Sequence, residues 1–308
     1  MSDTSRFVFG PVPSRRLGRS LGIDLVPLKT CSYDCIYCQL GRTGDLTVAR
    51  REYVPPERVV SDLRQALARR PDYITLSGSG EPTLYSPLGE LIARIKRITD
   101  IPVAVLTNGS LLWRPEVRRD LAEVDLLIPS LDAGDAALFE TVNRPHRSLD
   151  YAVMVEGLVR MRREFRGHFW LEVFLLNGLT GLSGQIEKLV EQVRRIGPER
   201  VQLNTVCRPP AEDYAVGLAP ERMAELARLF DPPAEVISDF HGVHREPEFA
   251  AGRRDLVDLL RRRPCTAGDI ADGLQMHLNA VAKYLEELVV SGEVESRRVD
   301  GLIYYRCR

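Results

Sequence analysis

The sequence predicts an α/β protein with a mostly parallel sheet, followed by a smaller C-terminal unit of a different kind. Between residues 21 and 238, short apolar runs alternate with amphipathic helical segments. The runs are apolar on both faces, which is typical of parallel strands covered by helices. The chain has 308 residues, 44% hydrophobic and 28% charged, which suits one large domain with an appendage.

The expected elements follow one another as repeated strand and helix pairs. Strands are expected at 21–26, 73–77, 103–107, 125–131, 169–176 and 200–206, with a weaker seventh at 234–238. Helices are expected at 57–70, 86–99, 114–124, 148–165 and 183–197, where apolar residues recur every three to four positions. Residues 6–18 are expected to add a short strand or flap across one edge of the sheet.

The pattern changes after a segment rich in Gly, Pro and charged residues. This change predicts an α/β domain at 1–238, a linker at 239–252 and a second domain at 253–308. Three short helices are expected at 253–264, 266–274 and 277–292, before a hairpin turned by Asp300-Gly301. Helices followed by a two-stranded wing resemble a winged helix-turn-helix, a variant of a motif best known for groove binding. Leu278, Val281, Leu285 and Leu288 are expected in its core.

The overall charge points to no particular partner. Lys plus Arg number 42 and Asp plus Glu 43, so no strong field draws the whole protein to nucleic acid or to an anionic membrane. The N-terminus has no signal-peptide pattern, and no stretch approaches 18 uninterrupted apolar residues. We therefore expect a cytoplasmic protein without membrane association, in which clustered cysteines serve a metal or catalysis more often than disulfides.

Three of the six cysteines, Cys31, Cys35 and Cys38, lie within the eight residues CSYDCIYC. A redox pair would need only Cys35 and Cys38. A zinc site would need a fourth ligand, and none lies nearby in the sequence. An iron–sulfur cluster held by three thiolates leaves one iron open for a small-molecule ligand. The cluster is the favoured interpretation, with structural zinc or incidental cysteines as the alternatives.

The spacing Cys-x3-Cys-x2-Cys after the first strand, with Tyr37 before Cys38, resembles the radical S-adenosylmethionine (radical SAM) superfamily. That resemblance implies a partial (β/α)6 TIM-like barrel in which Cys31, Cys35 and Cys38 hold a [4Fe-4S] cluster. It also implies S-adenosylmethionine as cofactor and an electron donor such as ferredoxin or flavodoxin. The chain looks most like a group of uncharacterised iron–sulfur oxidoreductases that is loosely related to the wyosine-forming tRNA enzymes.

Polar residues follow several expected strands, at the edge where open parallel sheets bind ligands. By the resemblance, the segment Gly78, Ser79, Gly80, Glu81 and Pro82 receives the methionine amino group. Similar positions in the superfamily contact the ribose and carboxylate of the cofactor, and here they are Thr107, Asn108, Ser130 and Asp132. Taken singly, each of these segments also suits a turn or a helix N-cap.

Four further residues are candidates for the substrate face. Asn143 and Arg144 offer an amide and a cation, although a surface loop explains them equally well. Glu172 is a charge within an apolar strand, so it either faces the interior of the barrel or pairs with an arginine. Asn204 is a polar residue on another strand. The hydrogen-abstracting step itself has no assigned catalytic residue.

The expected activity is reductive cleavage of S-adenosylmethionine to a 5′-deoxyadenosyl radical, which abstracts hydrogen from a macromolecular or metabolite substrate. RNA or tRNA modification, activation of a protein or peptide, and an iron–sulfur-sensing nucleic-acid-binding regulator are the alternatives. Residues 252–308 carry ten Lys and Arg against nine Asp and Glu. This balance is weak for nucleic acid, although Arg261, Arg262 and Arg263 cluster, so nucleic-acid binding, protein or peptide docking and a structural lid all stay open.

Overall fold

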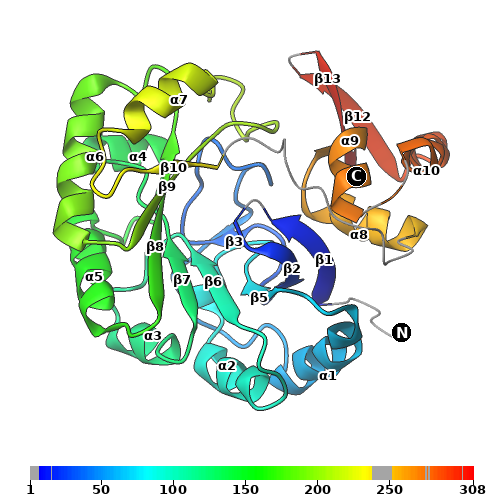
Figure 1. Ribbon diagram of the computed structural model, residues 1–308, viewed down its shortest axis with the longest axis horizontal. Coiled ribbons are helices and arrows are strands. Elements are labelled where there is room, and N and C mark those ends of the chain that lie inside the picture. Colours follow the sequence, from blue (N-terminus) through cyan, green and yellow to red (C-terminus); the bar gives the residue numbers. More distant parts are fainter. Residues whose placement is uncertain (1–6, 15, 238–251, 275, 277, 300) are drawn as a thin grey trace.

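The structure, a computed structural model, describes residues 7–14, 16–237, 252–274, 276, 278–299 and 301–308. Its centre is an eight-stranded sheet in the order β1-β2-β5-β6-β7-β8-β9-β10 (Figure 1). Neighbouring strands from β2 to β10 are parallel, and β1 runs antiparallel to β2. The strands are β1 Val8–Ser14, β2 Gly18–Ile23, β5 Tyr73–Leu76, β6 Val103–Thr107, β7 Leu126–Pro129, β8 His168–Leu175, β9 Arg200–Thr205 and β10 Glu235–Val236.

Helices cover the outer face of this sheet (Figure 1). They are α1 Pro56–Ala66, α2 Leu88–Lys96, α3 Pro115–Asp120, α4 Ala136–Val142, α5 Tyr151–Glu164, α6 Ser183–Ile196 and α7 Pro220–Ala227. Within the described residues the edge strands β1 and β10 do not pair, so the sheet stays open. The α/β fold with a mostly parallel sheet is therefore confirmed, and it is consistent with a partial barrel. The flap expected at 6–18 is the edge strand β1.

The core lies between the sheet and its helices because each element buries the face that its sequence period predicts. The four apolar residues of α2 at 88, 91, 92 and 95 follow the i, i+3, i+4, i+7 pattern of one helix face and are all fully buried. Val103, Ala104 and Val105 of β6 are also fully buried, so this strand is covered on both faces, as expected for a central parallel strand. Burial of each such large apolar side chain contributes about 1.5–3 kcal/mol.

The C-terminal unit, residues 252–308, has a core of its own. It comprises α8 Arg253–Arg262, β11 Cys265–Thr266, α9 Ala267–Leu274, α10 Leu278–Val290, β12 Val294–Val299 and β13 Leu302–Cys307, and its antiparallel sheet has the order β11-β13-β12. The three expected helices and the hairpin are present, together with the unexpected strand β11. Val281, Leu285 and Leu288 are buried, but Leu278 is 51% exposed at the start of α10, so its expected place in the core is wrong. Most of the expected linker lies outside the described residues.

The C-terminal unit packs against β1 (Figure 1). Arg262 Nε donates to Asp24 Oδ2 at 2.7 Å, and its guanidinium lies 3.8 Å from the centre of the Phe9 ring. Tyr304 Oη donates to the Cys207 carbonyl at 2.8 Å, and Arg297 pairs with Asp213 of the barrel. Arg262 and Arg297, which could contact the phosphates of a nucleic acid, therefore contact the barrel instead.

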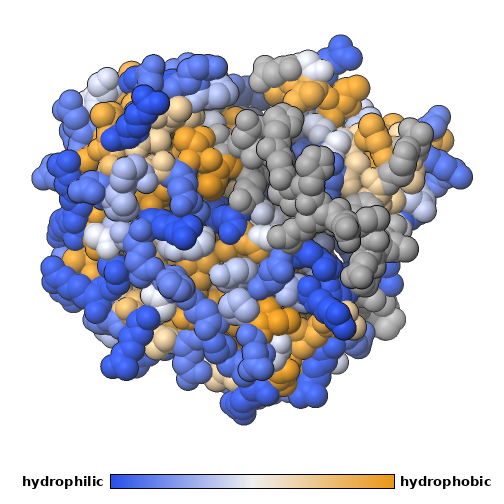
Figure 2. Space-filling model, in the orientation of Figure 1, coloured by the Kyte–Doolittle hydropathy of each residue, from blue (hydrophilic) through white to orange (hydrophobic). Residues whose placement is uncertain are grey.

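The surface seen in the same orientation is largely hydrophilic, with hydrophobic residues in groups between hydrophilic ones (Figure 2). Among the described residues, no helix combines the length and apolar character needed to span a bilayer.

Candidate functional site

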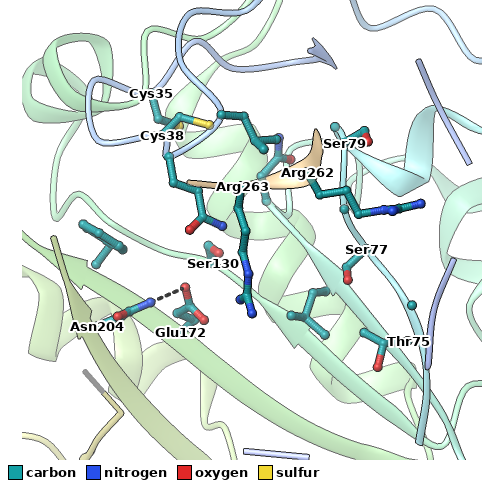
Figure 3. A pocket seen from close by; sticks show the side chains of 18 of the residues that line it. Cys35, Cys38, Thr75, Ser77, Ser79, Ser130, Glu172, Asn204, Arg262 and Arg263 are labelled. Carbon is teal, nitrogen blue, oxygen red and sulfur yellow. Dashed lines mark hydrogen bonds between the residues drawn. The ribbon is translucent and has the colours of Figure 1, made fainter. Parts of the chain in front are cut away.

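A cavity of about 450 Å³ lies at the ends of the parallel strands and extends beneath the C-terminal unit (Figure 3). Most of the residues singled out from the sequence line it. They are Cys31, Cys35, Tyr37, Cys38, Gly78, Ser79, Gly80, Glu81, Thr107, Asn108, Ser130, Glu172 and Asn204. Pro82, Asp132, Asn143 and Arg144 are not among the lining residues. The fold therefore brings together polar segments as far apart in the sequence as Cys31 and Asn204.

Each of the three clustered sulfurs accepts a hydrogen bond from a different side chain. Lys29 Nζ donates to Cys38 Sγ, Asn108 Nδ2 to Cys31 Sγ and Asn143 Nδ2 to Cys35 Sγ, all at 3.5 Å. Hydrogen bonds of this kind stabilise a metal-bound thiolate and tune the potential of an iron–sulfur cluster. The donor set around the sulfurs fits a cluster held by three thiolates.

Burial dominates the acidity of two of these thiols. It raises the pKa of Cys31 to about 12, with the Glu81 carboxylate adding to the effect, and raises the pKa of Cys35 well above its usual range. Both thiols must therefore lose a proton when a metal binds. The described residues include no group of three or more His, Cys, Asp or Glu arranged to hold a single metal ion. The fit to a cluster rests on the three sulfurs and their N–H donors.

Glu81 is a buried carboxylate held by four hydrogen bonds. Its Oε1 accepts from Thr83 N, Thr83 Oγ1 and Thr107 Oγ1 at 2.9, 2.7 and 2.6 Å, and its Oε2 accepts from Asn108 N at 2.7 Å. Burial raises its pKa, and the hydrogen bonds partly oppose that rise. Because Asn108 also donates to Cys31 Sγ, one residue links the glutamate to the cysteine loop. The carboxylate is therefore a rigid acceptor in the cavity wall.

The glycines before Glu81 are required by the protein's own packing. Gly78 has φ +140°, and a Cβ there would lie 1.9 Å from Asp24 Oδ1. A Cβ on Gly80 would lie 1.9 Å from the Thr30 carbonyl oxygen, next to Cys31. Ser79 N donates to Asp24 Oδ1 at 2.8 Å. The segment is thus pressed between Asp24 and the strand that leads into the cysteine loop.

Asp132 lies behind the cysteine loop. It is 4% exposed and accepts hydrogen bonds from Tyr37 Oη, from Asn143 Nδ2 at 2.7 Å and from Phe174 N at 3.0 Å. Burial raises its pKa to about 6. The Tyr37 ring stacks on Phe174 with its centroid 3.9 Å away. Asp132 and Asn143 therefore support the cysteine loop, and neither contributes to the cavity surface.

Arg144 fastens two loops together. Its Nε donates to the Asp34 carbonyl at 2.7 Å and its Nη1 donates to Glu212 Oε1 at 2.8 Å. Arg42 pairs with the same glutamate. Arg144 adopts φ +44°, a conformation that is rare outside glycine and is held here by these contacts. The structure places Arg144 between the cysteine loop and Glu212, away from the cavity.

Glu172 and Asn204 do lie in the cavity wall, on β8 and β9 (Figure 3). Asn204 Nδ2 donates to Glu172 Oε1 at 3.5 Å, and Glu172 forms an ion pair with Arg16. Arg16 also donates to Gln202 Oε1 at 3.1 Å. Glu172 therefore faces the interior and is also paired with an arginine, so these two positions do not exclude each other; binding of a ligand by Glu172 stays a prediction.

Similarity to known proteins agrees with this site. Residues 25–193 match the radical SAM superfamily. The protein designated UPF0026 protein MJ1312 from Methanocaldococcus jannaschii is 37% identical over 307 residues, which cover 96% of this chain and 94% of that protein. The chain belongs to the radical SAM superfamily and, within it, to the UPF0026 family.

Two further relatives bear on how far this similarity reaches. A protein named GTPase Obg from Brachyspira hyodysenteriae is 41% identical over 303 residues, covering 97% of this chain. The chain spans only 45% of that protein's length. A radical SAM methyltransferase from Sphaerobacter thermophilus has the same fold, with a TM-score of 0.55 at 20% identity over 70% of this chain and 65% of that one.

Membership of the superfamily makes the chain a radical SAM enzyme. Enzymes of this superfamily use a [4Fe-4S] cluster and S-adenosylmethionine and generate a 5′-deoxyadenosyl radical. The three buried sulfurs and their N–H donors are residues of the kind that this cluster requires.

Several residues of the site were not assigned from the sequence. Lys29 and Asp24 lie beside the expected motifs, but nothing in their spacing marks them. Arg263 comes from the C-terminal unit and still lines the cavity. Its only sequence signal is the run of three arginines, which equally suits a helix C-terminus or a nucleic-acid contact.

Gly78→Ala is expected to destabilise the fold by about 1–3 kcal/mol and to weaken S-adenosylmethionine binding, because the new Cβ would collide with Asp24 at a backbone angle unsuited to alanine. Chemical denaturation and equilibrium dialysis measure the two effects. Gly184→Ala, in α6 where a Cβ meets nothing within 4 Å, is the control, and it is expected to stabilise slightly. Equal changes in stability in Gly78→Ala and Gly184→Ala would contradict the conclusion that packing against Asp24 requires a glycine at position 78.

Proposed function

We propose that this radical SAM enzyme abstracts a hydrogen atom from a substrate that binds in the cavity beneath the C-terminal unit. One observation carries the proposal: the sulfurs of Cys31, Cys35 and Cys38 share a cavity with the fixed carboxylate of Glu81. In this proposal the three sulfurs hold the cluster, and the cluster with S-adenosylmethionine supplies the 5′-deoxyadenosyl radical by reductive cleavage.

The residues around the sulfurs have distinct proposed roles in positioning the cofactor. The segment Gly78, Ser79, Gly80, Glu81 and Pro82 places the Glu81 carboxylate to accept hydrogen bonds from an ammonium group, since Oε2 receives one donor, Asn108 N, among the described residues. Three polar residues at strand ends, Thr107, Asn108 and Ser130, border the same space. Asp132 acts indirectly, by orienting Tyr37 and Asn143 behind the cysteine loop.

Glu172 and Asn204 are the proposed substrate-facing residues. They lie in the cavity wall on β8 and β9, and their hydrogen bond together with the Arg16 ion pair holds both side chains in place. Asn143 and Arg144 are assigned to support of the cysteine loop, because their contacts are with Cys35, Asp132, Asp34 and Glu212.

We propose residues 253–308 as a separate domain of winged-helix type, because three helices and a hairpin occur in that order around their own core. The pairing of Arg262 and Arg297 with barrel residues favours the lid among the roles open to it. A small metabolite is then the favoured substrate. RNA or tRNA modification, activation of a protein or peptide, the iron–sulfur regulator and the relation to wyosine enzymes stay predictions, as does a ferredoxin or flavodoxin electron donor.

The proposal is tested by anaerobic reconstitution of the cluster followed by addition of dithionite and S-adenosylmethionine. We expect 5′-deoxyadenosine to form, as measured by liquid chromatography and mass spectrometry. A regulator that only senses the cluster would need the cysteines but no cofactor cleavage. An intact cluster with no 5′-deoxyadenosine would therefore reject the enzyme in favour of the regulator.

A further inference from the structure

The side chain of Arg263 projects into the cavity from the C-terminal unit (Figure 3). Its Nε is buried and has no hydrogen-bond partner among the described residues. Burial raises the pKa of the Cys265 thiol, and the charge of Arg263 and a hydrogen bond from its side chain partly oppose that rise. Among the residues that the structure describes, no carboxylate pairs with the Arg263 guanidinium. A guanidinium has five N–H donors and keeps its charge at any pH that a protein experiences. The cavity therefore contains a cation that has no carboxylate partner among the described residues and keeps an unused N–H donor at Nε.

Three neighbouring arginines, unlike Arg263, each have a carboxylate partner. Arg262 pairs with Asp24 at 2.7 Å, and Arg16 pairs with Glu172 and donates to Gln202. Arg261, on the other side of Arg262, is exposed and pairs with Asp258 of the same helix. Three consecutive arginines thus have three different environments, and among the described residues the third alone of them directs its charge into the cavity without a carboxylate partner.

The backbone around Arg263 holds this side chain in position. Arg263 follows α8, its N–H donates to the Leu259 carbonyl at 3.2 Å, and its own backbone is extended. Cys265, two residues later, is fully buried and pairs with Tyr305 of β13. The adjacent Arg262 is tied to Asp24, which also binds Ser79 of the Glu81 segment. Arg263 therefore lies between the end of α8 and β11, and the contacts of both elements position its guanidinium in the cavity.

We infer that Arg263 binds an anionic oxygen group, a carboxylate or a phosphate, of the substrate. A guanidinium recognises either group through two parallel N–H···O hydrogen bonds, which are strongest where water is excluded. An unpaired cation at such a place is costly until an anion joins it. The inference rests on the proposed function and sharpens it: the substrate is an anionic metabolite that the C-terminal unit covers and holds.

The test is isothermal titration calorimetry on the full chain with its cluster reconstituted, without reductant and with S-adenosylmethionine at saturation. Inorganic phosphate and acetate are the two titrants, at constant ionic strength, and they distinguish a phosphate from a carboxylate. We expect one of them to bind with one-to-one stoichiometry. The affinity is expected to fall about tenfold or more in Arg263→Gln and less in Arg263→Lys, which keeps the charge but loses the fork.

Arg261→Gln is the matched control, because it removes an equal charge two residues away on the exposed face, and it is expected to bind the anion like the wild type. Circular dichroism checks that each variant is folded. If Arg263→Gln does not fold, the comparison of Arg263→Lys with the wild type still tests the inference. Failure of both anions to bind the wild type, or equal binding by Arg263→Gln, overturns the inference.

If Arg263→Gln instead weakens S-adenosylmethionine binding by about tenfold, the anion is the cofactor's own carboxylate and the inference is also overturned. Absence of 5′-deoxyadenosine in the wild type is a separate result, because it rejects the proposed function without touching the calorimetric measurement.

Discussion

Cys35→Ala is expected to abolish both the absorbance of the iron–sulfur cluster and the formation of 5′-deoxyadenosine. Two thiolates remain after this change, and they leave two irons of a four-iron cluster without a protein ligand. The alanine also leaves the Asn143 amide without the sulfur that it contacts at 3.5 Å. Iron and sulfide content, the visible spectrum and anaerobic product analysis measure the effect.

Cys307→Ala is the matched control for this change. Cys307 belongs to β13 in the C-terminal unit, and its Sγ contacts the Val257 carbonyl, outside the cavity. The same loss of a thiol there is expected to leave the iron content and the cleavage activity at wild-type levels. Retention of the cluster or of the cleavage by Cys35→Ala would refute the assignment of Cys35 as a ligand.

Glu81→Gln is expected to lower the stability by about 1–3 kcal/mol and to weaken S-adenosylmethionine binding by about tenfold or more. Both carboxylate oxygens accept hydrogen bonds inside the protein. A glutamine offers one oxygen and one NH2 group, so an N–H donor would face either Asn108 N or the donors from Thr83 and Thr107. The negative charge proposed to attract the ammonium group is lost as well.

Chemical denaturation measures the first effect, and equilibrium dialysis with the reconstituted protein measures the second. Glu90→Gln makes the same chemical change on the exposed face of α2, where Glu90 pairs with Arg94. That control is expected to change the stability by no more than about 0.5 kcal/mol. Unaltered cofactor affinity in Glu81→Gln would exclude Glu81 from cofactor binding, whatever its effect on folding.

The contact between the C-terminal unit and the barrel links the prediction for Glu81 with the inference for Arg263. Asp24 accepts hydrogen bonds from Ser79 of the Glu81 segment on one side and from Arg262 of α8 on the other. The carboxylate is therefore shared between the segment proposed to hold the cofactor and the unit proposed to cover the substrate. A change that loosens the C-terminal unit removes a partner from Asp24, so its consequences extend to the cofactor side of the cavity.

The parts of the site that were readable from the sequence are the local ones. The spacing of Cys31, Cys35 and Cys38 and the segment at 78–82 are set by a few adjacent residues. Thr107 and Ser130 could be placed at the same edge because the carboxyl ends of parallel strands meet there. All of these predicted positions except Pro82 line one cavity. A short strand or flap was also expected at 6–18, and the edge strand β1 lies there.

Other assignments depended on the direction in which a side chain points, which the periodicity of the sequence does not specify. Asn143 and Arg144 follow a short helix, and only the packing turned them toward the cysteine loop and Glu212. Leu278 has the spacing of a core residue but lies at the exposed start of α10. Asp132 has the right strand end for a cofactor contact, yet its side chain points behind the loop to Tyr37.

The sequence by itself determined the α/β fold, the cysteine motif and hence the class of chemistry, because strand periodicity and ligand spacing are short-range properties of the chain. Only the tertiary structure decided what the C-terminal unit does to the cavity. Arg262 and Arg263 are adjacent in the sequence and chemically identical, but one meets Asp24 and the other meets no carboxylate among the described residues. That difference arises from contacts across more than 230 residues of chain, which neither composition nor periodicity records.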